Sequence, residues 1–218
     1  MDNLNKPTRW LECVSGADLK VEAQQLYRCL QIYEPKYSTA DPTVNKALCS
    51  LIGWVWRDDN WNALQLDYSK GMWLFGPLGT GKSTMMLGFR KYMANLTMRY
   101  SEAEDDYRLK AWFKSASEIA NDYAAKGSGA IVDYTSAQHN LIIDELGREP
   151  IPANNYGTKL NVIQHVMQIR YDHRRESVTH VTTNMALEDV TRLYGDYVAD
   201  RCVEMFNFIR LDGNSRRK

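Results

Sequence analysis

The stretch Gly71-Met-Trp-Leu-Phe-Gly76-Pro-Leu-Gly-Thr-Gly81-Lys82-Ser83-Thr84 reads as a short apolar strand, a glycine-rich loop and the start of a helix. Its second half has the phosphate-loop pattern Gly-x-x-x-x-Gly-Lys-Ser, in the strand–loop–helix setting that this motif requires. Glycines let the backbone curl so that consecutive N–H groups point at an anion, and the helix start adds the positive end of its dipole. We therefore expect a nucleotide-binding site made of Gly76, Pro77, Leu78, Gly79, Thr80, Gly81, Lys82, Ser83 and Thr84.

A second apolar stretch, Asn140-Leu-Ile-Ile-Asp144-Glu145, predicts a strand that ends in two carboxylates. Strands of a parallel sheet are buried on both faces, so charges belong at the carboxyl end, where ligands bind. Two acids after a strand could simply be solvated loop residues, but a phosphate loop upstream favours a functional role. Lys82 is expected to contact the β- and γ-phosphates of ATP, while Ser83 and Asp144 hold Mg²⁺. Glu145 is then placed to orient and deprotonate an attacking water.

The rest of the chain alternates between helical and strand patterns, which predicts an α/β fold. We expect a P-loop fold with a five-stranded, mainly parallel sheet flanked by helices, preceded by a short helical N-terminal segment. The predicted domains are a helical appendage at residues 1–40 and an ATPase domain at 41–218. Strands are expected near residues 72–75, 111–114, 140–145, 177–184 and 207–211, and helices near 17–33, 41–57, 83–94, 115–126, 155–170 and 196–205.

Several features carry both a structural and a functional interpretation. Asn184, at the end of the predicted strand 177–184, could touch both the water and the γ-phosphate, or it could cap the helix that follows. The tryptophans Trp54, Trp56 and Trp61 could stack on bases, although packing in the protein is the more common role of such a cluster. The apolar face of helix 17–33 could pack on the ATPase core or dock a partner protein.

Composition narrows the functional classes. The chain has 218 residues, and its 27 Lys and Arg balance 27 Asp and Glu, so no global field attracts it to nucleic acid or acidic lipid. Any DNA contact needs local basic groups, for which Arg170, Arg174 and Arg175 are the candidates. The four cysteines are scattered without metal-ligand spacing, as in a reducing compartment. With no membrane-spanning apolar run and no signal peptide, we expect a soluble cytoplasmic protein without membrane contact.

The ordered set of motifs resembles the DnaC/IstB branch of the AAA+ ATPases, which contains bacterial helicase loaders and ATPases that assist transposases. The similarity covers about residues 50–218 and rests on four segments: Gly76–Ser83, Leu141–Gly147, Thr182–Met185 and Tyr194–Arg201.

The resemblance implies roles for individual residues. It places Walker A at Gly76–Ser83, Walker B at Asp144 and Glu145, and sensor 1 at Asn184. Its trans-acting arginine finger looks like Arg201, and a nucleotide-contacting sensor-2 arginine is similar to Arg217. Relatives often carry a further arginine where this chain has Tyr197, which leaves Arg201 as the better finger candidate.

The resemblance also implies partners and an activity. We expect hydrolysis of ATP with Mg²⁺ in a nucleotide-dependent homo-oligomer that acts in DNA replication on a replicative helicase, with single-stranded DNA as a candidate partner. An IstB-like role with a transposase is the alternative within the family. From other classes, a P-loop small-molecule kinase and a non-enzymatic, nucleotide-gated binding module remain open.

Overall fold

The computed structural model describes residues 18–100 and 110–212 of the chain. These residues fall into two compact units, one formed by 18–68, 84–100 and 110–111 and the other by 69–83 and 112–212. The helix α4 (Lys82–Tyr100) begins in the second unit and continues in the first. The expected division at residue 40, between a helical appendage and an ATPase domain, stays a prediction.

The first unit consists of α2 (Leu19–Tyr33), α3 (Pro42–Trp56) and most of α4. Asp41 caps α3 by accepting from the Thr43 N–H, with Pro42 at the first helical position. Both features are the helix-start signals that the sequence carries. The described helices of the chain include none that is long and apolar enough to cross a membrane.

A buried carboxylate holds the helices of the first unit together. Glu22 is 4% exposed, and it pairs with Arg99 at 2.9 Å and accepts from the Tyr92 hydroxyl at 2.7 Å. Tyr92 in turn accepts from the indole N–H of Trp56 at 2.9 Å. Trp54 also packs edge-on against Phe89. Trp54 and Trp56 therefore pack inside the protein, which is the role that the sequence analysis favoured over stacking on bases. The buried face of α2 therefore includes the charged residue Glu22, whose burial the spacing of apolar residues did not predict.

The second unit is built on a five-stranded sheet in the order β2-β3-β6-β1-β7. The central strand β1 pairs in parallel with β6 and β7, and β3 pairs in parallel with β6. This confirms the mainly parallel sheet, and it brings the carboxyl ends of β1, β3 and β6 to one edge. The strands are β1 (Gly71–Phe75), β2 (Ala111–Ser115), β3 (Asn140–Leu146), β6 (Thr179–Thr183) and β7 (Phe206–Arg210).

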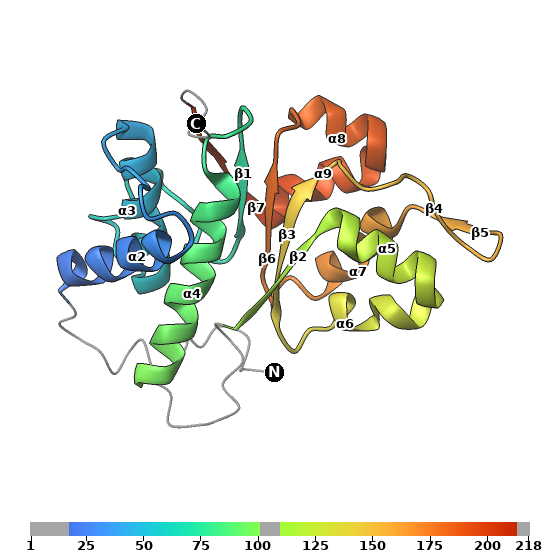
Figure 1. The fold of residues 1–218 in the computed structure, drawn as a ribbon, viewed down its shortest axis with the longest axis horizontal. Helices are drawn as coiled ribbons and strands as arrows, with labels where there is room; N and C mark the ends of the chain where they lie inside the picture. Colours follow the sequence, from blue (N-terminus) through green and yellow to red (C-terminus); the bar gives the residue numbers. More distant parts are fainter. Residues whose placement is uncertain (1–17, 101–109, 213–218) are drawn as a thin grey trace. The chain divides into compact units, whose positions relative to one another are not determined.

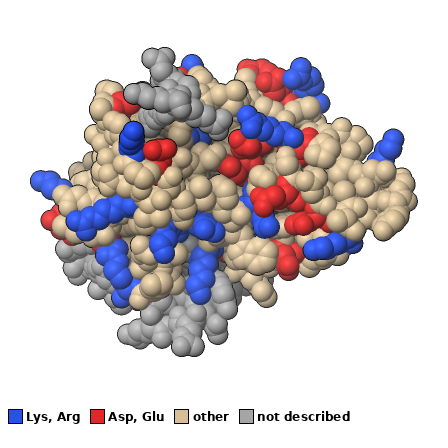
Figure 2. Space-filling model, in the orientation of Figure 1, with Lys and Arg blue, Asp and Glu red and all other residues tan. Residues whose placement is uncertain are grey.

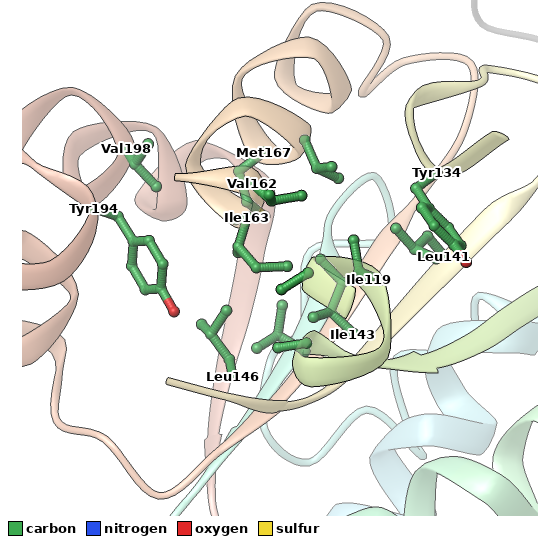
Figure 3. Close-up of a cluster of buried hydrophobic side chains, with 14 of the residues drawn as sticks. Ile119, Tyr134, Leu141, Ile143, Leu146, Val162, Ile163, Met167, Tyr194 and Val198 are labelled. Carbon is green, nitrogen blue, oxygen red and sulfur yellow. The ribbon is translucent and has the colours of Figure 1, made fainter. Parts of the chain in front are cut away.

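Helices of the second unit cover one face of this sheet (Figure 1). Ser115 and Glu118 form the predicted capping box at the start of α5. Buried side chains of α5, α7, α8 and α9 meet those of β3 and β6 in one core cluster, part of which Figure 3 shows. The helices are α5 (Ala116–Lys126), the 3₁₀ segment η1 (Gly127–Ile131), α6 (Val132–Thr135), α7 (Val162–Asp172), α8 (Leu187–Tyr194) and α9 (Asp196–Met205).

The helix expected over 155–170 is partly wrong. Its first third is a hairpin of β4 (Ala153–Asn155) and β5 (Thr158–Leu160), and α7 starts only at Val162 with Asn161 as its cap. The hairpin turn needs positive φ at Tyr156 and Gly157, and the Asn154 side chain accepts from the Gly157 N–H at 3.0 Å. This local turn chemistry outweighs the helical spacing of the apolar residues.

Arg170 does not belong to a surface patch, because its side chain is fully buried. It donates to the hydroxyls of Thr179 and Ser177. Burial lowers the pKa of its guanidinium to about 10. The same side chain also donates to four backbone carbonyls, those of Tyr134, Ser136, His139 and Val178. The DNA contact expected from Arg170 is therefore wrong; this residue ties α7 to the amino-terminal ends of β3 and β6.

Replacing Arg170 with Met should lower the free energy of unfolding by about 3 kcal/mol or more, because several buried acceptors lose their donor at about 1–3 kcal/mol each. For a chain of this size that is a drop in Tm of about 6 °C or more. Thermal unfolding followed by circular dichroism measures it. Arg175→Met, at an exposed position nearby, is the matched control and should change Tm little. Equal Tm values for the two variants would show that the buried network contributes nothing.

Candidate functional site

The phosphate loop has the conformation that its glycines predict. Gly76, Gly79 and Gly81 have φ values of +136°, +78° and +88°, which side chains disfavour. At Gly76 a Cβ atom would lie 2.2 Å from the carbonyl oxygen of Leu211, so only glycine fits there. Within the loop, the buried Thr80 donates to the Pro77 carbonyl at 3.0 Å.

The lysine of the loop is folded against it. Lys82 is 7% exposed, and its ammonium donates to the carbonyls of Gly76 at 2.8 Å and Pro77 at 2.7 Å. Such a buried cation at the start of a helix, beside a loop of curled backbone, favours an anionic ligand. Pro77 and Leu78 are exposed on the outside of the loop, and Thr84 follows Ser83 in α4.

The first acid of β3 meets the end of the phosphate loop. Asp144 is 8% exposed, and its carboxylate is hydrogen-bonded to the hydroxyls of Ser83 and Thr182. Burial raises the pKa of Asp144, and these two hydrogen bonds oppose that rise. A hydroxyl and a carboxylate side by side are oxygen donors of the kind that Mg²⁺ prefers. The pair therefore fits the magnesium ligands that the sequence predicted.

One threonine connects the two acids. The Thr182 hydroxyl donates to Asp144 at 2.5 Å and accepts from the backbone N–H of Glu145 at 3.0 Å. Glu145 has a φ of +55°, so the chain turns sharply directly after Asp144. Sequence reasoning missed Thr182, although its position two residues before Asn184 in a neighbouring strand was a usable signal.

The turn after the acids is fixed on both sides. Gly147 (φ +92°) lies against Met185, and its N–H donates to the buried Glu149 carboxylate at 2.9 Å. Glu149 also accepts from the buried Tyr194 hydroxyl at the end of α8. On the outer side, Arg148 pairs with the Glu145 carboxylate at 2.9 Å. None of these partners was predicted from the sequence.

Asn184 follows β6 at the same sheet edge as the acids. The register pairs Thr183 with Phe75 of β1 and with Leu146 of β3, so Asn184 comes directly after the point where the three strands end together. It does not cap the following helix: Ala186 is the N-cap of α8, and Asp189 accepts from its N–H. The side chain of Asn184 is exposed.

Arg201 lies in α9 between two tyrosine rings. Its guanidinium carbon is 3.1 Å from the ring centre of Tyr197 and 4.8 Å from that of Tyr171, so both rings form cation–π contacts with it. Its Nε is buried and has no hydrogen-bond partner among the described residues. Arg217 falls outside the described residues.

Two solved structures share this arrangement of strands and helices. The DnaC helicase loader covers 87% of this chain and 99% of its own length, with a TM-score of 0.57 and 17% identity. This chain has the fold of the DnaC helicase loader. A protein from Streptococcus pyogenes serotype M3, described as a primosome component, covers 84% of this chain and 87% of its own, with a TM-score of 0.57 and 20% identity.

Comparison by sequence alone found no relative. The chain matches no protein-family model and no curated protein. The likeness to DnaC therefore concerns the fold, and it confirms the resemblance at that level.

Replacing Asp144 with Asn should raise Tm at neutral pH in buffer without magnesium or nucleotide. Because burial raises the folded-state pKa above the unfolded value, the native chain binds more protons between the two values. Wild-type stability therefore falls as pH rises through the folded pKa, and Asn removes that loss. The gain should shrink as the pH is lowered and Asp144 becomes protonated. Asp200→Asn, at an exposed position, is the control; a gain for D144N that is constant across pH would contradict this account.

Proposed function

We propose that this protein is a Mg²⁺-dependent ATPase that couples hydrolysis to work on a partner in DNA replication. The observation that carries the proposal is the contact of Ser83 and Asp144 at the phosphate loop, with Thr182 fixing Glu145 beside them. A phosphate-binding loop alone would serve any nucleotide-binding protein. Two acids at its open edge, one of them partly exposed, are what hydrolysis by water needs.

In the proposed reaction, the loop N–H groups and Lys82 bind the β- and γ-phosphates. Glu145 takes a proton from a water molecule held by Asn184, the water oxygen bonds to the γ-phosphorus, and the bond to the β-phosphate oxygen breaks, leaving ADP and phosphate. Ser83 and Asp144 would hold Mg²⁺, which neutralises charge on the phosphates when it is bound.

Glu145→Gln should lower kcat for ATP by about 10²-fold or more while ATP binding changes little, since general-base catalysis contributes about 10²–10⁴. Lys82→Ala should instead lose nucleotide binding. Phosphate release at saturating ATP and titration with a fluorescent ATP analogue separate the two effects, with Glu176→Gln as an exposed control. Full turnover in E145Q would overturn hydrolysis by this base and would favour the small-molecule kinase. Binding without turnover in the wild type, at every protein concentration and with or without single-stranded DNA, would favour the binding module.

Arg201 is proposed to act on the nucleotide of a neighbouring subunit. What supports this is its partly exposed guanidinium on a helix, held by aromatic rings and lacking a partner for Nε. Arginine fingers supplied in trans contribute about 10³–10⁵ in rate, so an isolated subunit would be nearly inactive. Arg217 is proposed as a second arginine that contacts the nucleotide.

Mixing two inactive variants tests the finger. Arg201→Ala keeps the acids but lacks the finger, while Glu145→Gln keeps the finger but lacks the base. Each alone should lose activity by about 10²-fold or more, and an equimolar mixture should regain a substantial part, because E145Q subunits supply Arg201 to R201A sites. Phosphate release across a concentration series measures it. An inactive mixture whose subunits still assemble would contradict action in trans.

For the client, we favour a replicative helicase over a transposase, because both similar structures are named for replication. Capture by E145Q in the presence of ATP, from extracts of the source cells, would identify the bound protein; a transposase in the eluate would favour the alternative. A DNA contact by Arg174 and Arg175 stays a proposal. Figure 2 shows both basic and acidic side chains on the viewed face.

A further inference from the structure

Glu145, the more exposed of the two acids, forms an ion pair with Arg148. Nη1 of Arg148 donates to Oε1 of Glu145 at 2.9 Å, and the backbone N–H of Arg148 donates to the backbone carbonyl of Glu145 at 3.2 Å. Arg148 thus closes the turn over Glu145 with both its backbone and its side chain. Both side chains are partly exposed, at 44% for Arg148 and 34% for Glu145.

The turn that carries Arg148 has little freedom. Gly147 on one side is packed against Met185, and Glu149 on the other is buried and hydrogen-bonded to Gly147 and Tyr194. The backbone therefore holds the Cα of Arg148 within reach of the Glu145 carboxylate.

The contact involves an oxygen that the proposed chemistry needs. A general base must offer a free lone pair to the water from which it takes a proton. Oε1 of Glu145 instead accepts from a guanidinium, which cannot be deprotonated in a protein and has no lone pair to offer in exchange. While the ion pair is closed, one of the two carboxylate oxygens is engaged.

We propose that Arg148 is a positioning residue that holds Glu145 in an idle pairing, so that hydrolysis is faster when this ion pair is open. The inference rests on the proposed ATPase function. An exposed pair of this type shifts an equilibrium by about fivefold or less, so Arg148 tunes the rate and does not abolish it. The opening can be driven by any anionic group that competes for the guanidinium.

The test uses the full chain with Arg148→Gln, which removes the charge and keeps a polar side chain. We expect kcat for ATP hydrolysis to rise about two- to fivefold with KM unchanged. Arg148→Lys, which retains the charge, should keep the low rate. Arg192→Gln is the matched control: Arg192 also pairs with an acid three residues earlier, at 2.7 Å, but on the outside of α8. That variant should leave kcat unchanged.

The salt dependence of kcat is a second measurement, and it should not change if Arg148 has only a structural role. Since exposed pairs are screened, the ratio of R148Q to wild-type kcat should fall toward one as salt is raised at saturating ATP. If the wild type hydrolyses ATP and kcat of R148Q is unchanged or lower, the idle pairing is overturned, while the proposed ATPase function stands. The absence of turnover in both proteins, at ATP concentrations shown to saturate binding, overturns the proposed hydrolysis together with it.

Discussion

The buried carboxylate of Asp144 depends on hydrogen bonds from two hydroxyl groups. A carboxylate with 8% exposure would otherwise be costly, and the hydrogen bonds from Ser83 and Thr182 offset that cost. These donors come from the helix after β1 and from β6, the strand between β1 and β3. This strand order places the loop after β1 and the acid of β3 on either side of β6, which supplies Thr182.

The parts of the site that the sequence predicted are those whose signals are local. The loop glycines and Lys82 follow a fixed spacing, and Asp144 follows directly after an apolar strand. The role of Glu149 became evident only in the structure, because it depends on which helix is its neighbour. Thr182 had a usable signal in its position before Asn184, but its two hydrogen bonds depend on which strands are neighbours. Arg148 had a local signal, since it lies three residues after Glu145 across a turn, but most exposed ion pairs at such spacing contribute little, so the spacing alone does not distinguish it.

The errors in prediction have the same origin. Arg170 was expected at the surface because charge usually signals exposure, yet a set of hydroxyls and carbonyls satisfies it inside. The apolar spacing from Leu160 onward suits a helix, but the Asn154–Gly157 turn places a hairpin at residues 153–160. In both cases hydrogen bonds of polar groups decided the structure, tertiary ones for Arg170 and a local one in the hairpin turn, and the spacing of apolar residues does not contain them.

The neighbouring acids Asp144 and Glu145 differ in burial: the first is buried and the second is partly exposed. Asp144 is buried and accepts hydrogen bonds from two hydroxyls. Glu145 is fixed through its backbone N–H by the same threonine, but its side chain extends into a partly exposed region beside Arg148. A ligand for a cation needs the first kind of placement, since its oxygen must stay in position. A group that takes up and releases a proton in each cycle needs the second, because it must exchange partners. The proposed division of labour between these carboxylates thus follows from the different burial and partners of the two side chains.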